Sequence, residues 1–383
     1  MATDDNPVFQ VQDQFSIAVK DAPVLTYLSP NSADVAVVAA FAFDLEQRVL
    51  QAVLSPLGLP EALIQLHQHG LFKGFVQDSL KQLKRIRICD RKGKNFWLAH
   101  TNPARVNRAA GAGRPSPPVG IDLNALPNGT CFLERINQIW QQRFSQLAYT
   151  ILLDGEAHVC CVNPFPFGAV HCTIATEKHI DQRWSNRDDL AHVIRSLVEL
   201  SAKLPGWVVL LNGSSKAGAS IPGHRHYQVF QMDGAQRPFP LQLAASTALN
   251  CSATPIQPLV GGVDYPITVF RVRGGANEVI RATIELVARW RMYGDSCSEN
   301  LIAIHEAGNV TIYFAPRDDF ANAPGLAGAI ASLEILGEFL FCTETEIRSL
   351  MEGAVCYQWL WDALQAVAPP AAVELAGSSV IVS

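Results

Sequence analysis

The sequence predicts an α+β fold in which helices pack against an antiparallel sheet. Two strand-like runs within residues 147–167 are hinged at Asp154-Gly155, a pair typical of a two-residue hairpin turn. Residues 186–204 repeat apolar side chains at helical spacing after an Asn/Asp cap signal, and residues 206–213, "GWVVLLNG", then read as a short buried strand. This succession of strands, a long helix and another strand is typical of a sheet with a helix packed across it.

Strands and helices also alternate in the second half of the chain, although its sequence does not repeat that of the first half. We expect a strand at 265–274, a helix at 277–294, a hairpin at 300–317 that turns at Gly308-Asn309, and a closing helix at 343–367. Two lobes of related architecture are therefore possible.

The amino-terminal part is predicted to hold a helix around residues 60–83, which ends in the basic segment "KQLKRIR". We interpret this segment as a solvated helix end. The Gly/Pro-rich passage 109–120 has the composition of a surface loop and is the candidate linker.

These signals divide the chain into three parts. We expect an N-terminal segment packed on the core at 1–120, a catalytic half at 121–240 and a C-terminal α+β half at 241–383.

The overall charge excludes some classes of protein. With a formal net charge of −5 and 17% charged residues, the chain offers no excess of positive charge to a nucleic-acid backbone. The longest apolar run, residues 35–43, is too short to cross a bilayer, and the first ten residues lack the pattern of a secretory signal. We therefore expect no nucleic-acid or membrane partner and a cytoplasmic protein, whose nine cysteines are reduced thiols.

Two histidines and a glutamine at alternate positions carry the chemistry. On a strand, His224, His226 and Gln228 project to one face. The loop before them is rich in glycine and serine, so its backbone N–H groups can face an anion, and its Lys216 adds a positive charge. A neutral imidazole in such a place can attack phosphorus and hold the transferred group covalently.

The alternating histidines also have other interpretations. The two histidines can also be a structural pair in a polar pocket or two metal ligands. His67 and His69 have the same spacing, but they lie in a helix-like stretch without the loop or the glutamine, and we assign them to surface or structure.

The stretch "AGASIPGHRHYQ" resembles the signature of the histidine-triad (HIT) superfamily. It is similar to the branch with galactose-1-phosphate uridylyltransferases, GDP-sugar phosphorylases and dinucleoside tetraphosphate phosphorylases, where the motif is His-x-His-x-Gln. The resemblance implies a HIT-like antiparallel sheet, with His226 as nucleophile, His224 as its supporting neighbour and Gln228 as the amide that contacts phosphate.

Further stretches are similar to segments of the same branch: "VNPFPFGAVHCTIATEKHIDQ", "TNPARVNR", "CFLERINQIWQQ" and "YFAPRD". Arg105 and Arg317 could each bind substrate phosphate or form a surface salt bridge. Asn163 and His171 could shape the nucleoside pocket; the alternative is a strand-end turn for Asn163 and a core position for His171. The residues that we expect at phosphate or nucleotide are Asn212, Gly213, Ser214, Ser215, Lys216, Gly218, Ser220, Arg105, Asn163, His171 and Arg317.

The resemblance implies a nucleotidyltransferase or phosphorylase. Its substrate would be a nucleoside diphosphate sugar or a dinucleoside polyphosphate, and its acceptor inorganic phosphate or a sugar phosphate. The alternatives are a nucleotide hydrolase of the same superfamily and a non-catalytic nucleotide sensor. No cofactor is required. Where relatives show Cys-x-x-Cys, this chain has Cys131 and Glu134, so we expect no metal there and interpret Cys131 as a buried small residue.

Overall fold

In the computed structural model, the structure describes residues 58–72, 76, 85–103, 105, 131, 133, 148–232, 238–247, 255–319, 323 and 325–378. The chain divides into two compact units built from alternating segments. Unit 1 comprises Met1–Asp78, Asn107–Ile180 and Gly223–Phe230, and unit 2 comprises Ser79–Val106, Asp181–Pro222 and Gln231–Ser383. The linker 109–120 lies outside the described residues, and the sequence-based boundaries at 120 and 240 stay a prediction.

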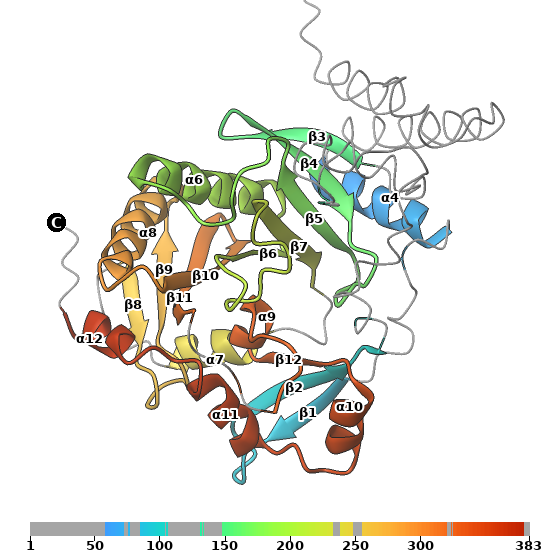
Figure 1. The fold of residues 1–383 in the computed structure, drawn as a ribbon, viewed down its shortest axis with the longest axis vertical. Helices are drawn as coiled ribbons and strands as arrows, with labels where there is room; N and C mark the ends of the chain where they lie inside the picture. Colours follow the sequence, from blue (N-terminus) through green and yellow to red (C-terminus); the bar gives the residue numbers. More distant parts are fainter. Residues whose placement is uncertain are drawn as a thin grey trace, which may run out of the picture. The chain divides into compact units, whose positions relative to one another are not determined.

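Unit 1 contains an antiparallel sheet in the order β3-β4-β5-β7 (Figure 1). Its strands are β3 (Ala148–Leu153), β4 (Glu156–Val162), β5 (His171–Thr176) and β7 (His226–Gln231). The predicted hairpin between β3 and β4 is confirmed, because Asp154 and Gly155 both have positive φ, 46° and 79°. Helix α4 (Leu59–Phe72) packs on β4 and β5.

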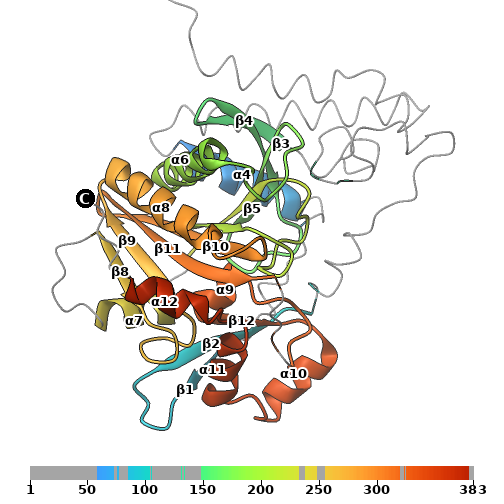
Figure 2. The same cartoon turned by 60° about the vertical axis from the view of Figure 1, so that its left-hand side comes forward.

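In unit 2, five antiparallel strands pair in the order β6-β10-β11-β9-β8. These strands are β6 (Trp207–Asn212), β8 (Ile256–Leu259), β9 (Val269–Gly274), β10 (Cys297–Glu306) and β11 (Asn309–Asp318). Helices α6 (Arg187–Lys203) and α8 (Ala276–Arg291) lie side by side across these strands (Figures 1 and 2). The predicted α+β class with a large antiparallel sheet is confirmed.

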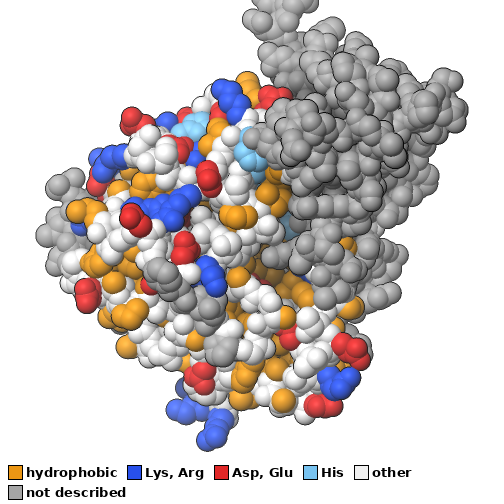
Figure 3. Space-filling view, in the orientation of Figure 1, with side chains coloured by type: hydrophobic (Ala, Val, Ile, Leu, Met, Phe, Trp, Pro, Cys, Tyr) orange, Lys and Arg blue, Asp and Glu red, His pale blue; other side chains and the backbone are white. Residues whose placement is uncertain are grey.

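Helix α6 begins and packs where its sequence predicts. The Asn186 side chain accepts a hydrogen bond from the Asp189 N–H at 2.9 Å, which caps the first turn. The apolar positions Leu190, Ile194 and Leu197 are fully buried against the sheet. Charged side chains of both signs are interspersed on the face shown in Figure 3. An ion pair between Arg187 and Glu285 joins α6 to α8.

The end of the chain differs from its prediction. The expected closing helix is two helices, α10 (Glu344–Met351) and α11 (Tyr357–Gln365), because Gly353 has a φ of 76° that a continuous helix does not allow. The structure adds α7 (Pro240–Thr247), α9 (Ser332–Ile335) and α12 (Ala371–Gly377). Within the described residues, no helix has the length and apolar character needed to span a bilayer.

A small three-stranded sheet in unit 2 overturns a second prediction. It has the order β1-β2-β12 and comprises β1 (Arg85–Cys89), β2 (Phe96–Thr101) and β12 (Glu338–Phe341). The expected solvated helix end at "KQLKRIR" is therefore wrong from residue 85 onward. Arginine and isoleucine alternate there with the period of a strand.

A buried ion pair connects the three strands of this small sheet. The Glu338 carboxylate lies 3.0 Å from Arg85 Nε and 2.6 Å from His100 Nδ1, and the side chains of Glu338 and His100 are fully buried. A buried carboxylate without such partners costs several kcal/mol. Burial lowers the pKa of His100, and the nearby Glu338 opposes this shift. The neutral ring therefore donates its Nδ1–H to Glu338.

Acidification is expected to destabilise the protein through His100. Because the pKa of His100 is lower in the folded protein than its usual value of 6.5, the unfolded chain binds this proton more readily. The contribution of neutral His100 to the free energy of unfolding is fully present above about pH 6.5 and is lost as the pH falls below this value. Urea unfolding at pH 7.5 and 5.5 should give a smaller difference in unfolding free energy for His100→Gln than for the wild type. An equal difference in both proteins would contradict this assignment.

Candidate active site

The register between β5 and β7 places the reactive side chains on one face. Ala175 pairs with His226 and Thr173 pairs with Gln228, so these side chains project to the same side of the sheet. The predicted strand, however, begins only at His226. His224 lies in the preceding bend, so the expectation that all three motif residues line one strand face is wrong for His224.

The ring of His226 is held in one tautomer. Its Nδ1 lies 2.8 Å from the backbone oxygen of His224. A carbonyl oxygen only accepts, so Nδ1 carries the hydrogen and Nε2 of the neutral ring carries the lone pair. The side chain is only 4% exposed. The backbone thus sets the direction of Nε2, the nitrogen that we expect to act as the nucleophile.

His224 supports His226 through its backbone, whereas we expected its imidazole to do so. Its own Nε2 donates to the carbonyl of Thr176 at 2.7 Å, which leaves the lone pair on Nδ1. Nδ1 lies 3.5 Å from the Cys131 sulfur, and the ring centroid lies 4.7 Å from that of His179. The imidazole of His224 therefore belongs to a different cluster from His226.

Gln228 contacts a histidine of the neighbouring strand. Its Oε1 lies 3.3 Å from Nε2 of His171, and the two side chains are 9% and 0% exposed. His171 also packs against the Phe167 ring at a centroid distance of 4.0 Å. Of the two interpretations of His171, the core histidine agrees with its burial, and its contact with Gln228 connects it to the motif.

Asn163 shapes the turn that follows β4. Its side-chain oxygen accepts from the Phe165 N–H at 3.0 Å, and its own N–H donates to the His171 carbonyl at 2.9 Å. These two bonds make the strand-end turn that we considered for this residue. Its place at a nucleoside stays a prediction.

The glycine- and serine-rich loop differs from the anion cradle that we expected. Four of its backbone N–H groups donate to acceptors inside unit 2: Gly213 to the Glu299 oxygen, Ala217 to Ser214 Oγ, Gly218 to the Ser215 oxygen and Ala219 to the Ser214 oxygen. Gly218 has a φ of 97°, and a Cβ there would lie 2.3 Å from the Ala331 Cβ. The loop is therefore folded onto its own unit, and these four amides do not face a ligand.

Two carboxylates lie beside the first residues of this loop. Ser214 Oγ bonds to Asp319 and lies 3.1 Å from Ser298 Oγ. A Cβ on Gly213 would lie 2.7 Å from an oxygen of Glu299, whose carboxyl pKa is raised because it is buried. This acidic side of the loop does not favour phosphate, so the assignment of the Ser214 hydroxyl to a phosphate is not supported.

Arg317 lies inside unit 2 and donates a hydrogen bond to the backbone of the glycine- and serine-rich loop. Its guanidinium is fully buried and donates to Asn300 Oδ1 at 2.5 Å, the Ile330 oxygen at 2.7 Å and the Lys216 oxygen at 3.1 Å. Burial lowers its pKa to about 10. Surface salt bridging is therefore wrong for Arg317, and two of its three nitrogens already have protein acceptors. We now interpret it as a residue that positions the loop.

Asn212 completes the same buried network. Its side-chain oxygen accepts from Asn300 Nδ2 at 2.7 Å and from Ser332 Oγ at 2.6 Å, while its Nδ2 donates to the Gly218 oxygen at 3.4 Å. Of the two partners that we considered for Asn212, the loop backbone is confirmed. Such a buried hydrogen-bond network favours one loop conformation.

The remaining predicted phosphate ligands differ in exposure. Ser215 and Ser220 are exposed, Lys216 is half-buried, and Arg105 is 5% exposed. The surface ion pair considered for Arg105 is thus wrong, because the side chain is inside the protein. Binding of phosphate by these four residues stays a prediction.

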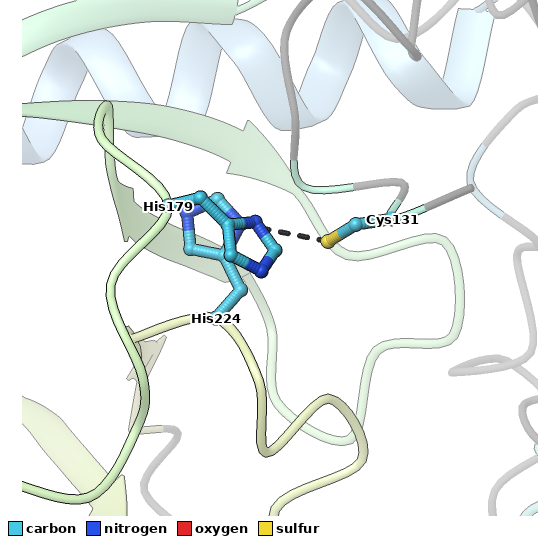
Figure 4. A group of neighbouring side chains, drawn as sticks. All are labelled: Cys131, His179 and His224. Carbon is cyan, nitrogen blue, oxygen red and sulfur yellow. Dashed lines mark hydrogen bonds between the residues drawn. The ribbon is translucent and has the colours of Figure 1, made fainter. Parts of the chain in front are cut away.

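Three side chains of types that can ligate a metal lie close together in unit 1, and one of them, His224, belongs to the motif (Figure 4). One donor atom each from Cys131, His179 and His224 lies within 4.8 Å of the others. A thiolate with two imidazoles is a donor set that zinc prefers, and the Thr176 carbonyl fixes His224 with Nδ1 toward the cluster, as a second-shell partner does. Cys131 is half-buried beside His224, so our interpretation of it as a plain buried residue is wrong. Glu134 lies outside the described residues.

Three residues of these clusters were not predicted from the sequence: His179, Asn300 and Ser332. His179 is three residues past the end of β5, and nothing local marks it as a neighbour of His224. Asn300 and Ser332 reach the loop across 88 and 120 residues of sequence. His67 and His69 are 3% and 4% exposed, which excludes the surface and leaves the structural role that we assigned to them.

Comparisons with known proteins agree with this fold. A family model described as a domain of unknown function, DUF4922, matches residues 67–231, which include the His-x-His-x-Gln motif. No curated protein matches the sequence. The structure is similar to yeast Ap4A phosphorylase Apa2 in complex with AMP, with a TM-score of 0.56 at 15% identity over 80% of this chain and 95% of that one. For Apa2 in complex with Ap4A the TM-score is 0.55 at 16% identity, over 81% and 97%.

The chain therefore has the fold of a dinucleoside tetraphosphate phosphorylase. That class is one of those in the histidine-triad branch that the motif resembles. The predicted α+β architecture with an antiparallel sheet is thus confirmed, and its fold is similar to that of Apa2.

The metal cluster gives the first prediction of this site. Protein produced with zinc in the medium is expected to contain about one zinc ion per chain, because three N/S donors converge there. Elemental analysis by mass spectrometry should show loss of the ion in Cys131→Ala and in His179→Ala. Cys89→Ala, which changes an exposed cysteine, is the matched control. Zinc-free wild type, or zinc retained in both variants, would exclude the site.

The role of Arg317 gives the second. Arg317→Lys should lower the free energy of unfolding by roughly 2–4 kcal/mol, because an ammonium cannot replace the buried forked contacts. Arg273→Lys, at an exposed position on β9, should change it by less than about 0.5 kcal/mol. Urea unfolding measures both. Wild-type stability in Arg317→Lys together with weaker nucleotide binding would return Arg317 to the phosphate-ligand interpretation.

Proposed function

We propose that this protein is a nucleotidyltransferase of the phosphorylase type, which cleaves a dinucleoside polyphosphate through a nucleotidyl group held on His226. One observation carries the proposal: His226 donates Nδ1–H to the His224 carbonyl, which places the lone pair of the neutral ring on Nε2, and the side chain projects to the face that also carries Gln228. Fold similarity to Apa2, a phosphorylase solved with Ap4A and with AMP, supports the substrate class.

In the first step, Nε2 of His226 forms a bond to an α-phosphorus. The bond between that phosphorus and its bridging oxygen breaks, and the electron pair leaves with the remaining nucleoside polyphosphate. The ring becomes positively charged as the N–P bond forms. The Nδ1–H bond to the His224 carbonyl stabilises this charge and keeps the ring in place.

Gln228 supplies a hydrogen-bond donor without a titrating proton. Its amide N–H₂ group can donate to a non-bridging oxygen as charge moves during the transfer. An amide is a poor general acid, so the leaving group must already be a good one, as a polyphosphate is.

In the second step, inorganic phosphate attacks the nucleotidyl-histidine from the side that the leaving group vacated. A new P–O bond forms, the N–P bond breaks, and a nucleoside diphosphate leaves while His226 is regenerated. With a sugar phosphate as acceptor, the same step would give a nucleoside diphosphate sugar. Water as acceptor requires a base to activate it, and Gln228 does not provide one.

The proposed metal cluster would act beside this chemistry. Cys131, His179 and His224 would hold the ion, and a bound zinc ion would tie the segment before β7 to the segment after β5. The reacting nitrogen belongs to His226, whose ring is not among the donors of the cluster.

Intact-protein mass spectrometry tests the proposal. Incubation with Ap4A in the absence of phosphate should add the mass of one AMP, which acid and added phosphate should both remove. His226→Ala should give no adduct, whereas His192→Ala, a control histidine on α6, should behave as the wild type. UDP-, GDP- and ADP-sugars are tested in parallel to separate nucleotide-sugar substrates from dinucleoside polyphosphates.

Each negative result points to a different alternative. Free AMP released without an adduct would indicate hydrolysis. Nucleotide binding with neither adduct nor product, and with unchanged affinity in His226→Ala, would indicate a sensor and refute the enzymatic proposal.

A further inference from the structure

The face of unit 1 that carries His226 and Gln228 also carries His171. Residue 171 pairs with Phe230 across β5 and β7, and Gln228 pairs with Thr173, so His171 and Gln228 are diagonal neighbours on the same face. Diagonal neighbours are close enough for long side chains to touch. The geometry of the two strands therefore brings an imidazole against the end of the glutamine amide.

The contact has a direction. Oε1 of Gln228 faces Nε2 of His171 at 3.3 Å. An amide oxygen only accepts, so Nε2 carries the hydrogen in this arrangement. If the amide turned over, its N–H₂ group would face the Nε2–H donor, and two donors would oppose each other. In its Nε2–H tautomer, His171 therefore keeps the N–H₂ end of the Gln228 amide facing away from it.

The surroundings keep His171 in place. The side chain is fully buried, and its ring lies 4.0 Å from that of Phe167, which is itself in edge contact with Phe230 at 5.0 Å. A ring packed in this way loses little further entropy when it donates a hydrogen bond. His171 is thus rigid enough to orient a flexible glutamine side chain.

We propose that His171 is a positioning residue that turns the N–H₂ group of Gln228 toward the phosphoryl group during transfer. The proposal rests on the function proposed above. It assigns His171 a role through Gln228, in place of contact with the nucleoside. Loss of a single preorganised donor at a developing oxyanion costs roughly 10²–10³ in rate, and misorientation of that donor costs part of this.

A double-mutant cycle tests the proposal. His171→Phe keeps the aromatic packing and removes the donor, and Gln228→Ala removes the amide. The rate of AMP transfer from Ap4A to His226 in a single turnover should fall roughly 10–100-fold in His171→Phe. In the Gln228→Ala background the same change should have less than about a 2-fold effect, because the residue that His171 orients is gone. His171→Gln, which retains a donor, should recover part of the rate.

Binding and stability separate positioning from a structural role. The dissociation constant of AMP should change less than about 3-fold in His171→Phe, whereas a nucleoside ligand would lose affinity together with rate. Urea unfolding shows whether the variant is folded, and if His171→Phe is not, the cycle is run with His171→Leu, which also removes the donor. Additive effects of the two changes, or a wild-type rate in His171→Phe, would overturn the proposal.

Nuclear magnetic resonance detects the hydrogen bond between His171 and Gln228 without requiring turnover. In ¹⁵N-labelled protein, His171 should be protonated on Nε2 in the neutral form, and the Gln228 side-chain N–H₂ signal should shift in His171→Phe. If the wild type forms no adduct with any donor, the proposed function fails. The NMR result then decides on the His171–Gln228 contact alone, and an Nδ1–H tautomer of His171 would refute it.

Discussion

The hydrogen bond from His226 Nδ1 to the carbonyl of His224 is the constraint on which the rest of the site depends. It spans only two residues, yet it exists because the chain bends before β7 and turns that carbonyl toward the ring. Backbone bonds from Arg225 to Ile180 and from Thr176 to Arg225 hold the bend. The direction of the reacting nitrogen is therefore set by main-chain atoms, which a change of side chain elsewhere does not easily disturb.

The parts that the sequence could predict are those that local rules decide. The hairpin at Asp154-Gly155 follows from two residues that tolerate positive φ, and α6 follows from its cap and its apolar spacing. The shared face of His226 and Gln228 follows from strand alternation. The same reasoning went too far when it extended the strand back to His224, because strand ends depend on pairing partners that the sequence does not reveal.

The conformation of the glycine- and serine-rich loop could not be predicted from its local sequence. Glycine permits a loop to face an anion, but it equally permits the loop to fold against Asn300, Arg317 and Ser332. These partners come from segments about 80 to 120 residues away in the chain, so only the tertiary structure decides between the two outcomes. Here one loop amide donates to the Glu299 carbonyl and three donate to Ser214 or Ser215 within the loop, since an unsatisfied buried polar group costs more than a solvated one. For the same reason, the sequence did not reveal that Arg317 is buried and contacts this loop.

Three histidines of unit 1 illustrate how one side chain serves three purposes. In each ring one nitrogen is bonded to an oxygen that only accepts: His226 Nδ1 to the His224 backbone, His224 Nε2 to the Thr176 backbone, and His171 Nε2 to the Gln228 amide. That bond selects the tautomer and thereby the chemistry of the ring. In the roles that we propose, it leaves Nε2 for attack in His226 and Nδ1 for the thiol or an ion in His224, while in His171 the bond itself orients the glutamine. A histidine motif therefore has to be interpreted from the acceptors around each ring, because spacing along the chain does not distinguish these three roles.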